Sequence, residues 1–323
     1  MTYNNIFFDN LKKFKNKKAL ILESGQTITY NQLDKEAKTL LKKLPDKKKL
    51  IFLLGENNFE TIVGYLAFAK KGFSVAILDS KINDIFLNSL IKLYKPSFIF
   101  CSKKKQKILK KFKKIIKFRS FVLNQKLNQK DYKINKDLML LVSTSGTTGS
   151  PKFVRQSYTN IKSNTKSIVK YLKIENKDVT ITSLPFSYVY GLSVINSHLH
   201  SGSTIVLTNR SIVEKEFWEQ VKKYKVSNFS GVPYSYSMIA RIGEKNLPSS
   251  FKYTTQAGGK MNHELIRRII DIYIKKKIKF IQMYGSAEAT SRMSYLDWQY
   301  AEKKIGSIGK PIPGGKFSLR DNK

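Results

Sequence analysis

A dense run of small and hydroxyl-bearing residues, ending in a lysine, is the part of this sequence best suited to bind an anion. The run consists of Ser143, Thr144, Ser145, Gly146, Thr147, Thr148, Gly149, Ser150, Pro151 and Lys152. Its two glycines let a ligand approach the backbone closely, where successive N–H groups can donate hydrogen bonds to an anion. Its hydroxyls add further donors, and the lysine adds a positive charge that suits phosphate oxygens. The run therefore predicts a phosphate-binding loop.

The residues around this loop distinguish it from other phosphate-binding motifs. Residues 138–142 have the composition of a buried strand, and open α/β sheets bind ligands beyond the carboxyl ends of their strands. A Walker loop would end in Gly-Lys-Ser or Gly-Lys-Thr, whereas Gly149 is followed by Ser-Pro-Lys. The alternative is a surface loop that is rich in small residues by accident. The density of hydroxyls directly after a buried strand favours the binding loop.

The elements that must position this loop alternate in type along the chain. Short apolar runs alternate with stretches of helical spacing, which predicts an α/β fold with mainly parallel sheets. Strands are expected at 50–54, 74–78, 98–101, 121–123, 138–142, 180–184, 204–207, 226–229, 253–256 and 279–283, and helices at 58–71, 82–94 and 103–117. A polar loop is expected at 124–136.

Two stacked α/β lobes are the simplest arrangement of these elements. The first lobe is expected over residues 1–136, and the second, which carries the phosphate loop, over 137–300. Residues 301–323 are expected to begin a β subdomain that is truncated, with a strand and turn at 317–323.

Composition limits the kind of protein this is. The 323 residues include 60 lysines and arginines against 23 aspartates and glutamates, a formal net charge of +37. The lysines are spread over most of the chain, so a nucleic-acid partner is not expected. The single cysteine, Cys101, excludes an intrachain disulfide and a cysteine-based zinc site. No stretch approaches the roughly 18 apolar residues of a membrane helix, so we expect a cytoplasmic protein without a transmembrane segment.

The densest basic run lies at residues 103–117. Its apolar residues recur at the spacing of one helix face, and they are Ile108, Leu109, Phe112, Ile115 and Ile116. We expect an amphipathic helix whose apolar face packs on a sheet while its lysines face water. The alternative is a basic helix that lies on a membrane or on nucleic acid.

Six further segments accompany the loop, and together they resemble the adenylate-forming superfamily: acyl-CoA synthetases, adenylation domains of non-ribosomal peptide synthesis, and luciferases. In chain order they are Thr-Tyr-Asn-Gln-Leu at 29–33, the helix-Gly-strand-Asp stretch at 66–79, the aromatic segment 183–193, Gln-Ala-Gly-Gly at 256–259, Tyr-Gly-Ser-Ala-Glu at 284–288, and Gly-Ser-Ile-Gly-Lys-Pro-Ile-Pro-Gly at 306–314. The resemblance covers nearly the whole chain. It implies activation of a carboxylic acid by ATP and Mg²⁺ to an acyl-adenylate, for transfer to CoA or to the phosphopantetheine thiol of a carrier protein.

The resemblance also implies roles for individual residues. The residues implied for ATP are Thr144, Ser145, Gly146, Thr147, Thr148, Gly149, Lys152, Gly258, Gly259, Tyr284 and Gly285. Lys152 and Glu288 are the implied catalytic residues, and Glu288 is the implied Mg²⁺ ligand together with Thr147, because a hard cation prefers oxygen donors. The residues implied to wall the acyl pocket are Tyr188, Tyr190 and Gly191. Their apolar neighbours favour an apolar acyl group.

The sequence departs from the family pattern at several positions. Ala287 replaces the threonine of Tyr-Gly-x-Thr-Glu, which removes a hydroxyl near the nucleotide phosphate. Tyr188 stands where many acyl-CoA synthetases have a histidine, so no imidazolium is present there. No aspartate occurs between Ser183 and His200, which argues against an amino-acid substrate.

The family's Thr-Gly-Asp motif and its C-terminal domain have no counterpart in the chain. We therefore expect a C-terminal domain that is encoded separately, or an acyl carrier protein, as a partner, unless the chain is a fragment. The alternative function is a non-catalytic or split-enzyme core that binds nucleotide and acyl ligands. The three histidines, His198, His200 and His263, are expected at the surface or in structural roles.

Overall fold

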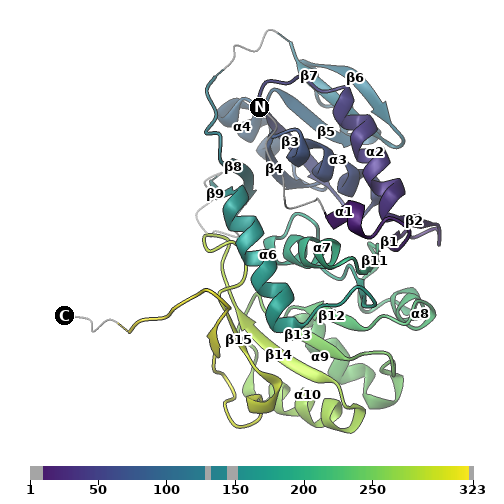
Figure 1. The fold of residues 1–323 in the computed structure, drawn as a ribbon, viewed down its shortest axis with the longest axis vertical. Helices are drawn as coiled ribbons and strands as arrows, with labels where there is room; N and C mark the ends of the chain where they lie inside the picture. The colour runs from purple at the N-terminus through teal and green to yellow at the C-terminus, as the bar shows by residue number, and fades with distance from the viewer. Residues whose placement is uncertain (1–9, 128–131, 144–151, 320–323) are drawn as a thin grey trace.

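A computed structural model describes residues 10–127, 132–143 and 152–319, and Figure 1 shows two sheets stacked one above the other. The seven-stranded sheet has the order β6 (Phe112–Phe118), β7 (Phe121–Lys126), β5 (Phe98–Ser102), β3 (Leu50–Gly55), β4 (Ser74–Asp79), β8 (Leu138–Ser143) and β9 (Phe153–Ser157). Its centre, from β5 to β8, is parallel, whereas β6, β7 and β9 pair antiparallel at the two ends. Every residue of β3 is buried, as expected for a parallel strand covered on both faces.

The nine-stranded sheet has the order β16 (Lys310–Pro311), β15 (Ser294–Leu296), β14 (Lys279–Tyr284), β13 (Tyr253–Gln256), β12 (Asn228–Gly231), β10 (Val179–Ile181), β11 (Thr204–Val206), β1 (Lys18–Ile21) and β2 (Thr27–Thr29). It is parallel from β14 to β1 and antiparallel at β15, β16 and β2. The predicted α/β fold of two stacked, mainly parallel sheets is confirmed.

The two sheets exchange segments across the expected division at residue 136. The early strands β1 and β2 join the nine-stranded sheet, whereas β8 and β9, which follow residue 136, join the seven-stranded sheet. The domain ranges 1–136, 137–300 and 301–323 stay a prediction. Both sheets therefore contain strands from both sides of residue 136. Strand pairing, and not closeness in the sequence, decides which sheet a strand joins.

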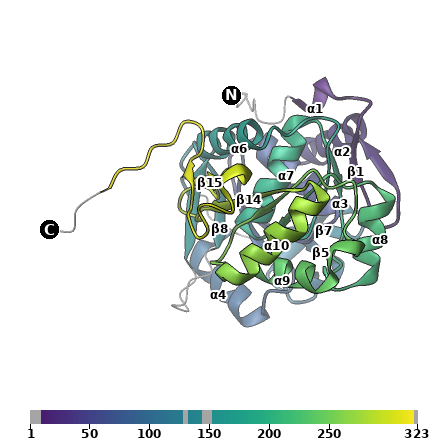
Figure 2. The same ribbon diagram turned by 90° about the horizontal axis from the view of Figure 1, so that it is seen from below.

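Helices fill three layers around the two sheets. Between the sheets lie α2 (Tyr30–Lys42), α3 (Phe59–Lys70), α6 (Tyr158–Leu172) and α7 (Val189–Ser201), with α1 (Asn10–Lys13) at the edge. The outer face of the seven-stranded sheet is covered by α4 (Asp84–Tyr94). Figure 2 shows α9 (Pro233–Ile242) and α10 (His263–Lys276) in front of the nine-stranded sheet, beside α8 (Lys215–Lys223). Short turns complete the set: α5 (Lys103–Gln106), η1 (Glu244–Asn246) and η2 (Trp298–Tyr300).

Two of the central helices, α2 and α3, begin where polar side chains cap them. Thr29 starts α2 with a capping box, since its hydroxyl accepts from the Gln32 backbone N–H and the Gln32 side chain accepts from the Thr29 N–H. Asn58 caps α3 by accepting from the Thr61 N–H at 2.9 Å. The predicted helix at 58–71 is therefore confirmed almost to the residue.

The expected basic helix at 103–117 is wrong. Only Lys103–Gln106 is helical, and Phe112–Phe118 forms the edge strand β6. Phe112, Ile116 and Phe118 recur at even spacing, so the same apolar residues also fit the two-residue period of a strand. Pairing with β7 decides between the two periods. The exposed lysines of β6 then serve a different purpose, because charged side chains on an edge strand oppose pairing with another sheet.

The expected strand at 317–323 is also not found where the structure describes it, over residues 317–319. Leu319 is 102% exposed, and Figure 1 shows this part of the chain leading away from the body of the molecule. A strand needs a neighbour for its backbone hydrogen bonds, and none of the described strands pairs with these residues. Within the described ranges, no helix is long and apolar enough to cross a membrane.

Candidate functional site

A cavity of about 1040 Å³ opens where the carboxyl ends of strands from both sheets meet. Asp79 ends β4 and Ser143 ends β8 in the seven-stranded sheet, and Tyr284 ends β14 in the nine-stranded sheet. The start of α7 forms another wall. Parallel strands place their carboxyl ends at one edge, which is where open α/β sheets bind ligands.

The cavity brings together most of the predicted site residues that the structure describes. Those that line it are Tyr188, Tyr190, Gly258, Gly259, Tyr284, Gly285 and Glu288. Gly191 lies in the first turn of α7 without lining the cavity, and Lys152 is exposed just before β9. The predicted loop residues Thr144, Ser145, Gly146, Thr147, Thr148 and Gly149 lie outside the described residues.

Gly258 lies against Tyr188 at the floor of the cavity. Gly258 follows β13 with a φ of +82°, a conformation that favours glycine, and an added Cβ would collide with the Tyr188 hydroxyl. Gln256 fixes the same turn, because its side-chain amide donates to the Gly259 carbonyl at 2.8 Å. The two glycines therefore leave exposed backbone without side chains beside Tyr188. Such a surface can accept a planar group such as a nucleotide base.

The segment after β14 turns sharply and presents an aromatic face and a carboxylate. Gly285 cannot carry a side chain without displacing the backbone, since a Cβ there would collide with the Ser291 carbonyl oxygen. Tyr284 is 48% exposed at the cavity wall, and Glu288 is exposed as well. Ala287 is buried between them, and its carbonyl accepts from the Gln156 side chain of β9 at 2.7 Å. This bond ties the Tyr284–Glu288 turn to the strand that follows the predicted loop.

Tyr190 and Arg292 form the buried end of the cavity. The Tyr190 hydroxyl donates to the Thr255 carbonyl at 2.9 Å, and burial raises the pKa of this phenol to about 12, so it stays protonated. The Arg292 guanidinium carbon lies 5.0 Å from the centre of the Tyr190 ring. Arg292 is only 2% exposed and donates to the Ser193 hydroxyl at 3.1 Å and to the Tyr171 hydroxyl at 3.3 Å.

Sequence reasoning missed Arg292. No carboxylate among the described residues forms an ion pair with it, although buried charges are ordinarily paired. It thus supplies a buried positive charge to the cavity wall. Its position shortly after the Tyr-Gly-x-x-Glu segment was visible in the sequence, but its burial was not. Asp79 and Met283 also line the cavity and were missed as site residues.

The metal-binding side chains at the cavity suit a Mg²⁺ ion that is bound partly by substrate phosphates, and not a metal ion bound by protein ligands alone. In the described part of the chain, no group of three or more histidine, cysteine, aspartate or glutamate side chains is arranged to bind a metal. Glu288 is a carboxylate at the cavity wall. Mg²⁺ is ordinarily bound by one or two carboxylates plus substrate phosphates and waters. A single exposed glutamate in the cavity that Ser143 also lines, directly before the predicted phosphate loop, fits that pattern.

Known relatives resemble this chain over most of its length. A 2-succinylbenzoate–CoA ligase from Bacillus licheniformis is 29% identical over 188 residues, which is 58% of this chain and 38% of the relative. A hybrid PKS-NRPS synthetase from Fusarium sp. is 25% identical over 320 residues, which is 93% of this chain and 8% of that protein. The chain thus spans well under half the length of these relatives.

Solved structures share the fold. O-succinylbenzoate coenzyme A synthetase from Bacillus subtilis, in complex with AMP, superposes with a TM-score of 0.76 at 22% identity, covering 94% of this chain and 64% of that chain. The N-terminal domain of FACL13 from Mycobacterium tuberculosis superposes with a TM-score of 0.79 at 18% identity, covering 97% and 83%. The profile of the family described as "AMP-binding enzyme" matches residues 7–323, so the chain belongs to the AMP-binding enzyme family.

Proposed function

We propose that this chain is the nucleotide- and acyl-binding core of an enzyme that activates a carboxylic acid as an acyl-adenylate. The acid's carboxylate attacks the α-phosphorus of ATP, forming the mixed anhydride and releasing pyrophosphate. The observation that carries the proposal is the single cavity in which Tyr284, Gly258 and Glu288 meet the end of β8. Catalysis of phosphoryl and nucleotidyl transfer rests mainly on positioning and on neutralising charge, and this cavity can supply both.

The base, the phosphates and the metal ion of Mg·ATP are each assigned to proposed contact residues. The ring of Tyr284 and the backbone at Gly258 are suited to a planar base. The residues that follow Ser143, together with Lys152, are proposed to bind the phosphates. Glu288 is proposed to hold Mg²⁺, which would neutralise phosphate charge when bound. These roles rest on the family pattern and on the placement of the described residues around one cavity.

The acid is proposed to be largely apolar. Tyr188, Val189 and Met283 line the cavity near the buried Tyr190. Burial also raises the pKa of Tyr188, so its phenol stays neutral. A protonated histidine at this position, in contrast, would place a positive charge in the cavity. The wall therefore favours apolar contact over ionic contact, apart from Arg292.

CoA is the proposed acceptor of the acyl group. The name of the Bacillus licheniformis relative specifies a CoA ligase, and the Fusarium relative, a PKS-NRPS synthetase, makes a carrier-protein thiol the alternative. Because the chain spans 38% of the first relative, completion of the reaction is proposed to need a further segment or partner. A core that binds ligands without turnover is the competing function, favoured by Ala287.

ATP–pyrophosphate exchange tests the proposal. The chain is assayed with a panel of carboxylic acids, including 2-succinylbenzoate and simple apolar acids, while ATP binding is followed by calorimetry. We expect Mg²⁺-dependent exchange with at least one acid. Glu288→Gln and Lys152→Ala should each lower the exchange rate on the order of a hundredfold, the usual cost of losing one electrostatic contact to the transition state.

Matched variants check that these losses are local. Glu264→Gln removes an exposed glutamate in the first turn of α10, and Lys166→Ala removes an exposed lysine on α6. Both should exchange at the unsubstituted rate. Saturable ATP binding without exchange would favour the competing function, a non-catalytic or split-enzyme core, and the absence of both binding and exchange would refute the proposal altogether.

A further inference from the structure

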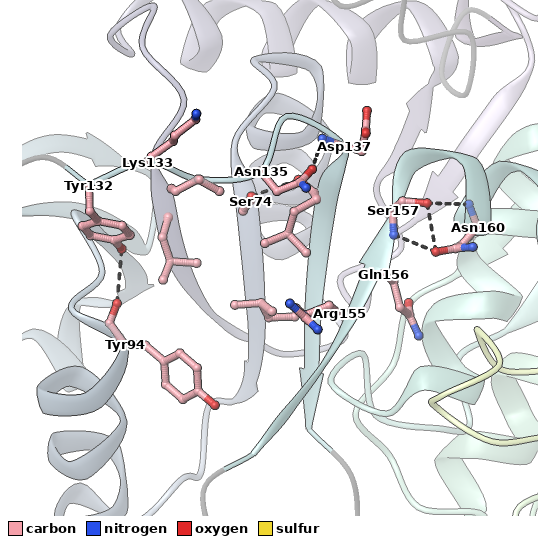
Figure 3. A pocket seen from close by; sticks show the side chains of 14 residues that line it. Ser74, Tyr94, Tyr132, Lys133, Asn135, Asp137, Arg155, Gln156, Ser157 and Asn160 are labelled. Atoms are coloured by element: carbon pink, nitrogen blue, oxygen red, sulfur yellow. Dashed lines mark hydrogen bonds between the residues drawn. The ribbon is translucent and has the colours of Figure 1, made fainter.

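A second cavity lies on the outer face of the seven-stranded sheet, the face that α4 covers, away from the proposed active site. Its volume is about 510 Å³, within the range of small-molecule sites. It is bounded by the end of α4, by the segment that leads into β8, and by β8 and β9 (Figure 3). None of the residues named for ATP or the acid line it.

The floor of this cavity is apolar. Leu50 and Leu141 are buried at its base, and Leu138 and Ile134 are half-buried at its side. The Tyr94 ring closes one end and packs against Phe153, with ring centres 4.8 Å apart. Such a floor gains free energy by covering an apolar body, at roughly 25 cal/mol per Å² removed from water.

Most polar groups around the cavity already bind one another. The Tyr132 hydroxyl donates to the Tyr94 carbonyl at 3.2 Å, and the Asn135 side chain accepts from the Asp137 N–H at 2.8 Å. Ser157 and Asn160 form the capping box of α6. Figure 3 draws these bonds as dashed lines. They leave little free capacity for a neutral polar ligand.

Arg155 is the exception. Its side chain extends from β9 across the floor between Tyr94 and Gln156, as Figure 3 shows. Within the described ranges it has neither an ion pair nor a hydrogen bond to its guanidinium. Lys133 and Asp137 also line the cavity, but in Figure 3 both point away from Arg155. One solvent-exposed guanidinium without a protein partner in the described ranges therefore lies beside an apolar floor.

We propose that this cavity is a second ligand site, which binds a small monocarboxylic acid with an apolar body. A planar guanidinium binds a carboxylate through two parallel hydrogen bonds, and the leucines cover the rest of the ligand. One cation suits one negative charge. A phosphate dianion would need further donors that this floor lacks.

Fluorine NMR can test this site separately from the proposed active site. Lys133→Cys places a thiol at the rim of this cavity, and Lys260→Cys places one at the rim of the other. Each is labelled with a trifluoromethyl group. Cys101 will not be labelled, because it is buried and burial raises its pKa to about 12. The probe is 4-phenylbutyrate, and its neutral amide, 4-phenylbutyramide, is the comparison.

We expect 4-phenylbutyrate to shift the Lys133→Cys signal saturably, and the amide to bind at least about tenfold more weakly. Adding Arg155→Gln to the labelled Lys133→Cys variant should weaken the binding of 4-phenylbutyrate by a similar factor. Arg267→Gln, which removes an exposed arginine from α10, should leave the titration unchanged.

Three results would overturn the proposal. They are equal affinity for the acid and the amide, equal effects of Arg155→Gln and Arg267→Gln, and a signal shifted by inorganic phosphate alone. The Lys260→Cys signal reports the proposed active site independently, so failure at one cavity is not confused with failure at the other.

Discussion

Mild acid should destabilise this protein through His198, a buried histidine on α7. His198 is 2% exposed, and its Nδ1 donates to the Val194 carbonyl at 2.8 Å. Burial lowers the pKa of His198 from its ordinary 6.5 to about 4, although the hydrogen bond to Val194 acts in the opposite direction. Arg292, which also disfavours a second positive charge, is close enough to contribute.

The sign and size of the effect follow from proton binding. Between pH 6.5 and pH 4 the unfolded chain binds a proton at this histidine that the folded chain does not, so the free energy of unfolding falls as pH falls. Each pKa unit is worth about 1.4 kcal/mol, which gives about 3 kcal/mol in full and about 2 kcal/mol by pH 5. That is a large share of the roughly 5–15 kcal/mol that stabilises a typical domain.

Urea unfolding at pH 7.5 and pH 5.0 measures this loss. The unsubstituted chain should lose about 2 kcal/mol more between the two pH values than His198→Asn, in which nothing titrates at this position. His263→Asn removes an exposed histidine at the start of α10 and should behave like the unsubstituted chain. If His198→Asn and the unsubstituted chain lose equal free energy, the histidine is not held neutral by burial and the reasoning fails.

Two further substitutions probe the proposed active site. Gly285→Ala should lower the free energy of unfolding by about 3 kcal/mol, because its Cβ would meet the Ser291 carbonyl. Gly25→Ala, where the nearest atom to a Cβ is the Tyr224 hydroxyl at 3.5 Å and φ is +84°, should cost only about 1 kcal/mol, and equal costs in urea unfolding would contradict the steric argument. Arg292→Met should keep or raise stability while lowering ATP–pyrophosphate exchange, since a buried cation without a carboxylate partner does not favour folding. A loss above about 2 kcal/mol with exchange intact would show instead that Arg292 serves folding.

The sequence predicted those features that depend on local patterns. The parallel strands at 74–78 and 253–256 were readable because continuous apolar or β-branched runs end at glycine or polar residues. The strand β6 was not, because its apolar residues fit both a helix face and a strand face. Only pairing with β7 decides between them, and pairing is a property of the tertiary structure.

The residues of the candidate site also fall into those that local motifs predict and those that only the tertiary structure reveals. Tyr284, Gly258 and Glu288 could be predicted because short motifs carry them, and the structure shows that all three line one cavity. Arg292 was missed because an isolated arginine ordinarily lies at the surface, and its burial depends on Ser193 and Tyr171 from two other helices. The predicted phosphate loop itself lies outside the described residues, so its role stays a prediction.

The two sheets contribute complementary halves of the proposed active site. Ser143, at the end of β8, leads into the predicted phosphate loop from the seven-stranded sheet, whereas Tyr284 comes from the nine-stranded sheet. Neither sheet alone could bind both ends of a nucleotide. The bond from Gln156 on β9 to the Ala287 carbonyl crosses between the halves, and one hydrophobic core contains residues of both sheets. A ligand that spans the cavity would therefore contact two sheets that are already joined. Its binding should cost little conformational entropy for fixing one sheet relative to the other.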